Sequence, residues 1–92
     1  MLRIEIPSNG SSKLTFNELE KYTIPPPTNG FNSEINNNVV MDFDDEQQAI
    51  DYAHELDAYS NSIDHKSQEY RIVADIIKAI GEDEFVRTYI QG

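Results

Sequence analysis

The chain of 92 residues contains no cysteine. This absence excludes a disulfide framework, a thiolate metal site and a thiol nucleophile, and it is typical of a reducing compartment. Long hydrophobic runs are missing too, because no window approaches the roughly 18 apolar residues of a membrane span. The opening MLRIEIPSNG lacks the apolar run of a signal peptide. We therefore expect a soluble, cytoplasmic protein.

Basic residues are scarce, since seven Lys and Arg stand against 17 Asp and Glu, which gives a formal net charge of -10. Such a charge repels nucleic acid phosphates and anionic lipid, and it attracts basic protein surfaces. Direct binding to nucleic acid or to a membrane is therefore not expected. The expected partner is a basic protein surface, such as that of a nucleic-acid-binding protein or complex.

The missing bases leave one segment strongly acidic. Residues 22–65 contain nine acids and no base, whereas the remaining 48 residues contain eight acids and seven bases. Bases placed among helical acids would add about 0.2 to 0.5 kcal/mol for each pair, so their exclusion has a cost. Two interpretations remain open: a functional acidic surface, or a solvated face that serves solubility and the helix dipole.

The first half of the chain predicts two strands. Leu2, Ile4 and Ile6 alternate with polar residues, as in a half-buried strand, and residues 39–43 (VVMDF) show a second alternation. Residues 13–24 fit either a strand or a short helix; the sequence TFNE resembles a capping box and favours the helix. Residues 24–38 are rich in Pro and Asn and are predicted as a loop in which Asn29 and Gly30 turn the chain.

The second half predicts three helices. Asp44 should cap a helix over residues 45–59, with Gln47 completing the box, and a second helix should open near Asp64 and end at Gly81. Their predicted buried stripes are Ala49, Tyr52, Ala53, Leu56 and Tyr59 in the first, and Tyr70, Val73, Ile76, Ile77 and Ile80 in the second. The third helix carries an apolar face of Phe85, Val86, Tyr89 and Ile90. Tyr59 and Tyr89, near element ends, are the tyrosines expected to be most exposed.

These elements predict a single α+β domain over residues 1–92. A small sheet from the N-terminal half would pack on a C-terminal helical hairpin, with a short third helix after it.

Motifs for chemistry are absent. A calcium loop that starts at Asp42 would need Gly at its sixth and Glu at its twelfth position, where the chain has Gln47 and Ala53. His54 and His65 lack the HExxH spacing of a metal site and are expected to be solvent-exposed. No catalytic fingerprint occurs. We therefore expect neither an enzyme nor a bound cofactor or metal.

With these motifs absent, a binding protein is the expected class, and its conspicuous feature is a group of acidic residues. The predicted partner-binding residues are Asp42, Asp44, Asp45, Glu46, Asp51, Glu55 and Asp57. On a helix, Asp51 and Glu55 would stand about 6 Å apart along the axis, so a groove shaped for a nucleic acid backbone could accept such a row. The function predicted from this row is occlusion of a basic site.

In size and charge the chain resembles phage-encoded inhibitors of host defence, including nucleic acid mimics and some anti-CRISPR proteins. The resemblance covers composition alone and assigns no functional residue. The alternative is a scaffold or assembly protein that acts through Phe85, Val86 and Ile90, in one form as a homodimer.

Overall fold

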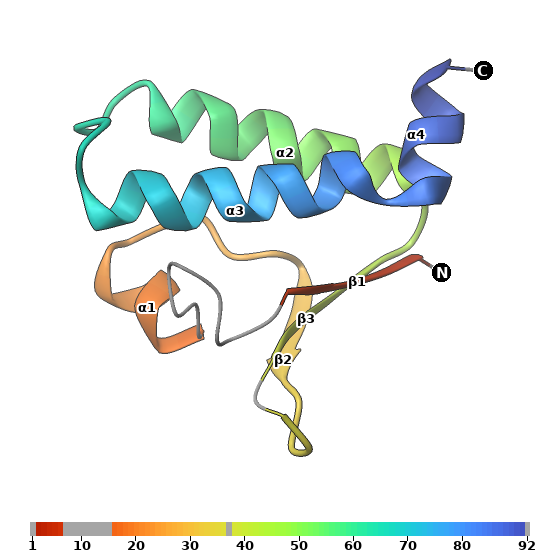
Figure 1. The fold of residues 1–92 in the computed structure, drawn as a ribbon, viewed down its shortest axis with the longest axis horizontal. Coiled ribbons are helices and arrows are strands. Elements are labelled where there is room, and N and C mark those ends of the chain that lie inside the picture. Colours follow the sequence, from red (N-terminus) through yellow and green to blue (C-terminus); the bar gives the residue numbers. More distant parts are fainter. Residues whose placement is uncertain (1, 7–15, 37, 92) are drawn as a thin grey trace.

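The computed structural model describes residues 2–6, 16–36 and 38–91, and the elements in these ranges form two layers (Figure 1). The elements are β1 (Leu2–Ile6), α1 (Phe16–Lys21), β2 (Asn29–Asn32), β3 (Val39–Phe43), α2 (Glu46–Ser60), α3 (Gln68–Glu82) and α4 (Glu84–Gln91). The strands pair antiparallel in the order β1-β3-β2, and α2 and α3 cover one face of the sheet. The predicted α+β class is confirmed, with its small sheet, helical hairpin and short final helix.

The core lies between the sheet and the helical hairpin. Leu2, Ile4 and Ile6 point into it while Arg3 and Glu5 are exposed, as the alternation of β1 predicts. The largest fully buried side chains come mainly from the central strand and the two long helices, with one each from α1 and α4: Val39, Met41, Phe43, Leu56, Ile72, Val73, Ile76, Ile80, Leu19 and Val86. Residues 16–21 are helical, so the short helix that TFNE favours forms within residues 13–24, of which the structure describes residues 16–24. Its predicted cap, Thr15, lies outside the described residues.

The prediction for residues 24–38 is wrong in one respect, because Asn29 and Gly30 open a third strand instead of a turn. β2 pairs with β3 so that Gly30 lies opposite Met41 and Phe31 opposite Val40. Two partners are needed to satisfy the backbone groups of both edges of β3, and the cross-strand contact of Phe31 with Val40 adds to that pairing. This tertiary demand overrides the turn preference of Asn-Gly, and the chain turns instead at residues 34–36.

The predicted start of the first long helix is displaced by one residue. Asp45, not Asp44, is the N-cap of α2, and its carboxylate accepts a hydrogen bond of 2.9 Å from the backbone N–H of Gln48. The amide oxygen of Gln48 in turn accepts from the backbone N–H of Asp44 at 2.7 Å. Gln48 therefore takes the reciprocal role that was assigned to Gln47.

Both predicted ends of the second long helix also move. Ser67 caps α3 by accepting from the backbone N–H of Tyr70, while Asp64 stabilises the preceding turn through the N–H of Lys66. Gly81 lies inside α3 and does not adopt a positive φ. The helix ends instead at Glu82, and Asp83 is its C-cap. The carboxylate of Asp83 accepts from the N–H groups of Phe85 and Val86 and so begins α4.

Candidate protein-interaction surface

Within the described ranges, no helix is long and apolar enough to cross a membrane. The same ranges contain no group of three His, Asp or Glu side chains placed to hold a metal ion. His54 and His65 are exposed, as predicted, and the ring of His65 stacks on Tyr70 with centroids 4.5 Å apart. The histidines are therefore surface groups, and the other exposed candidates for a binding surface are the acids and the apolar residues.

Asp42 lies on the face of the sheet that points away from the helices. The guanidinium of Arg3 donates to both of its oxygens, with Nε to Oδ1 at 2.7 Å and Nη2 to Oδ2 at 3.0 Å. The hydrogen bonds from Arg3 lower the pKa of Asp42. Arg3 also lies over the half-exposed ring of Phe31, 5.6 Å from its centroid. Arg3, a base from the N-terminal part of the chain, thus forms an ion pair with Asp42. The two residues are 39 positions apart, so sequence spacing could not reveal this pair.

Three further predicted acids lie where β3 turns into α2. Asp44 is exposed, and Asp45 uses its carboxylate as the cap described above. Glu46 lies in the first turn and lines a cavity of about 370 Å³ together with Leu2, Asp83 and Phe85. Asp45 therefore serves the helix itself, whereas Glu46 lies beside α4.

Asp51 and Glu55 are the two predicted acids that share one exposed flank of α2, and we call this pair the acidic flank. They line a recess of about 160 Å³ together with Pro26 and Thr28. Beneath them the buried hydroxyl of Tyr52 donates to the carbonyl of Pro25 at 2.8 Å, and burial raises the pKa of Tyr52. This hydrogen bond links the proline segment to the acidic side of the helix.

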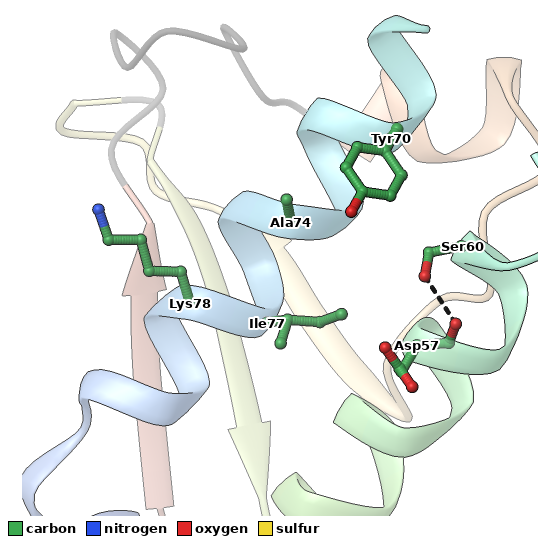
Figure 2. A pocket seen from close by; sticks show the side chains of 6 residues that line it. All are labelled: Asp57, Ser60, Tyr70, Ala74, Ile77 and Lys78. Atoms are coloured by element: carbon green, nitrogen blue, oxygen red, sulfur yellow. Dashed lines mark hydrogen bonds between the residues drawn. The ribbon is translucent and has the colours of Figure 1, made fainter. Parts of the chain in front are cut away.

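Asp57 faces a different direction. It lies six residues after Asp51, which places it about 120° away around the helix. Figure 2 shows it in the groove between α2 and α3, a cavity of about 260 Å³ lined by Asp57, Ser60, Tyr70, Ala74, Ile77 and Lys78. The ammonium of Lys78 is directed away from the Asp57 carboxylate, while Ser60 donates to the Asp57 carbonyl at 2.6 Å. The groove therefore presents a carboxylate beside apolar walls, separate from the acidic flank.

The predicted apolar face of the last helix divides in the structure. Val86 is fully buried, whereas the side chains of Phe85, Tyr89 and Ile90 are 64%, 49% and 64% exposed. At 100° per residue, Phe85 and Tyr89 lie about 40° apart on one flank of α4, and Ile90 lies about 140° from Phe85 on the other. We call Phe85 and Tyr89 the α4 patch.

Gln47 joins the α4 patch to the acidic flank. The hydroxyl of Tyr89 donates to Gln47 Oε1 at 2.8 Å, and Gln47 Nε2 donates to Asp51 Oδ1 at 2.9 Å. No sequence pattern indicates the bond between Tyr89 and Gln47, because the two residues are 42 positions apart in the chain. Tyr59, the other tyrosine expected to be exposed, is instead partly buried and donates to the Tyr22 carbonyl and to Glu69.

Comparison of the chain with protein-family models, with curated proteins and with solved structures finds no match. No functional residue is therefore transferred from a relative. The placement of charge, the exposure of apolar side chains and the hydrogen bonds between them are the grounds for the function proposed below.

Proposed function

We propose that this protein is a non-enzymatic inhibitor that occupies the basic site of a nucleic-acid-binding protein or complex. The observation that supports the proposal most directly is the acidic flank: Asp51 and Glu55 are exposed side by side on α2. They lie one helical turn apart, about 6 Å along the axis, which is nearly two of the steps of about 3.4 Å by which phosphates advance along one nucleic acid strand. The flank would take the place of that backbone in a Lys- and Arg-lined channel.

The charge of the whole chain favours such an encounter. A formal net charge of -10 steers the protein toward cationic surfaces and speeds association, and it disfavours direct contact with nucleic acid. A cytoplasmic setting belongs to the same proposal, which would be the host cytoplasm for a phage-encoded protein of the anti-CRISPR type. Inhibition by occlusion requires no catalytic group or cofactor.

The remaining predicted acids take different parts in this proposal. Asp44 is exposed near the start of α2 and can extend the anionic surface, whereas Glu46 lies beside α4, about 140° around the helix from Asp51. Asp42 is opposed by Arg3, and Asp57 faces the groove between the two long helices. Asp42 and Asp57 therefore contribute to the long-range field more than to direct contact.

The test compares two variants with the same net charge. One carries Asp51→Asn and Glu55→Gln, and the control carries Glu20→Gln and Glu34→Gln, which remove two exposed acids from other parts of the molecule. We expect the first pair to weaken binding to immobilised polylysine and to any partner captured from a lysate, while the control remains close to wild type. Wild-type binding should also weaken as the salt concentration rises. Equal binding by both variants would contradict a specific role for the acidic flank.

A second candidate function is assembly through α4, and the exposure of Phe85 and Ile90 favours it. Val86, which the alternative also required, is buried and unavailable to a partner. Sedimentation at two concentrations distinguishes the candidates, because an assembly protein of this kind would gain mass with concentration and lose that gain on Phe85→Ala. The net charge disfavours self-association, so this candidate ranks second.

A further inference from the structure

We propose that the α4 patch and the acidic flank form one docking surface for a heterologous protein segment that presents an apolar side chain among lysines or arginines. The inference rests on the proposed function and deepens it by specifying the chemistry of the partner. It assigns binding roles to Phe85 and Tyr89 on α4, and a positioning role to Gln47 on α2.

The two halves of this surface are continuous. α4 packs against the beginning of α2 (Figure 1). Tyr89 bonds Gln47 there, and Phe85 lines one cavity with Glu46. The hydrogen bonds from Tyr89 to Gln47 and from Gln47 to Asp51, at 2.8 and 2.9 Å, join an aromatic ring to a carboxylate through a single side chain. A partner that covers Tyr89 therefore comes within reach of Asp51.

A cavity lies beside the α4 patch. Its volume is about 370 Å³, and its lining combines the apolar side chains of Leu2 and Phe85 with the carboxylates of Glu46 and Asp83. Arg3 also lines it, but its guanidinium already binds Asp42. The Asp83 carboxylate caps α4, so Glu46 is the other acid of the lining. An apolar wall beside such an acid suits a lysine or arginine side chain, whose methylene stem packs on apolar surface while its charged head meets the carboxylate.

The charge of the surface favours a foreign partner over a second copy of this chain as its occupant. A twofold dimer built on this surface would bring the same patch of each subunit together, and with it both acidic flanks and both Glu46 side chains. Each subunit has a formal charge of -10, so this arrangement concentrates like charges at the contact. A foreign segment that carries bases beside an apolar side chain would neutralise these acids and pack on the α4 patch. The surface is therefore complementary to such a segment.

The two parts of the surface would have different energetic roles. Charges at the edge of an interface chiefly raise the association rate, whereas a few buried aromatic or arginine side chains provide most of the affinity. The acidic flank fits the first role. Phe85 and Tyr89, which are exposed although both are large and aromatic, fit the second.

The experiment uses the whole chain and two synthetic helical peptides as probes. One peptide is amphipathic, with leucines on one face and lysines on the other; its match has serine in place of each leucine. We expect the wild-type protein to bind the leucine-containing peptide more tightly. The double variant Phe85→Ala and Tyr89→Ala should weaken that binding about tenfold and leave binding of the serine peptide unchanged.

Ile90→Ala is the matched control, because Ile90 is as exposed as Phe85 and lies on the opposite flank of the same helix. We expect it to bind both peptides like wild type. The inference is overturned if Ile90→Ala weakens binding as much as the double variant, or if the double variant affects both peptides equally. It is also overturned if sedimentation shows a dimer that Phe85→Ala dissociates, since the occupant would then be a second copy.

Two further variants separate this inference from the proposed function. Gln47→Ala should reduce the difference in affinity between the two peptides, because Tyr89 and Asp51 lose their common partner. Asp51→Asn with Glu55→Gln should weaken both peptides, as the proposed function requires. If only the variant Asp51→Asn with Glu55→Gln binds like wild type, the acidic flank is rejected and the α4 patch stands as an apolar site. If only the variant Phe85→Ala with Tyr89→Ala keeps the wild-type preference for the leucine-containing peptide, the α4 patch is rejected and the acidic flank stands.

Discussion

The helices α3 and α4 follow each other directly and show the same kind of apolar periodicity, yet the protein uses their faces differently. The stripe of α3 is buried, with Ile72, Val73 and Ile76 fully inaccessible. In α4 only Val86 is buried, and the rest of its apolar residues remain in solvent. Periodicity identifies an apolar face in both helices, but only the packing of the sheet and α2 decides which face is covered.

The cause of the difference lies in the position of each helix. α3 crosses the sheet and packs along α2, so its stripe meets two elements over fifteen residues. α4 is eight residues long and stands at one end of the hairpin (Figure 1), and Val86 is its one buried side chain. Five substitutions test this contrast, in order of decreasing expected effect.

Ile76→Ala should have the largest effect on stability. Ile76 is fully buried in the core, and its truncation removes apolar contacts and leaves a cavity, at a cost of about 3 kcal/mol. Chemical denaturation would measure the loss as a lower transition midpoint. A cost below about 1 kcal/mol would show that the α3 stripe is not the main support of the fold.

Asp83→Ala should cost about 1 kcal/mol in the stability of α4, because the carboxylate of Asp83 accepts from the first N–H groups of that helix. If α4 is attached as loosely as its exposure indicates, the loss is local. Tryptic cleavage after the exposed Arg87 should then accelerate while the denaturation midpoint of the core changes less. Glu84→Gln, which removes a neighbouring charge and keeps the cap, is the control.

Tyr59→Phe should cost about 1 kcal/mol at neutral pH, because the hydroxyl bonds the Tyr22 carbonyl at 2.8 Å and Glu69 at 3.2 Å. Burial and then the bond to Glu69 raise the pKa of Tyr59. A raised pKa means that this contribution is complete below about pH 10, the ordinary tyrosine value, and is lost as the pH rises through the folded-state pKa. The gap between wild type and variant should therefore narrow in alkaline solution.

Tyr89→Phe is the matched substitution on α4, where the hydroxyl is exposed and bonds only Gln47 among the partners described. It should change stability by less than about 0.5 kcal/mol at neutral pH. Tyr59 lies on α2 and bonds Glu69 of α3, whereas Tyr89 bonds α2 from α4. An equal loss of stability for both variants would mean that α2 holds α4 as firmly as it holds α3.

Phe85→Ala should have the smallest effect on folding. Its ring is mostly exposed, so truncation removes little buried area and should change the unfolding free energy by less than about 0.5 kcal/mol. Paired with Ile76→Ala, it compares two large apolar residues of adjacent helices. A loss of 2 kcal/mol or more would show that Phe85 belongs to the core, and its proposed binding role would lose its basis.

Much of the fold follows from local patterns. The alternation of Leu2, Ile4 and Ile6 predicts β1, and the spacing of apolar residues predicts α2 and α3. The predictions are wrong at the ends of helices and in the pairing of strands. β2 forms because β3 needs a second partner. The start of each helix depends on which of several adjacent Asp and Ser side chains reaches a backbone N–H. Strand pairing and capping depend on distances between atoms in the folded chain, which the spacing of residues in the sequence does not give.

For the candidate surface, the sequence by itself determined the charge of the protein and the positions that share a helix face. It placed Asp51 and Glu55 on one flank of α2 because one helical turn separates them. Only the tertiary structure decided that Arg3 opposes Asp42, that Gln47 connects Tyr89 to Asp51, and that Phe85 stays in solvent while Val86 is buried. The physical reason is that helix geometry is local, whereas ion pairing, hydrogen bonding between elements and burial depend on residues far apart in the chain.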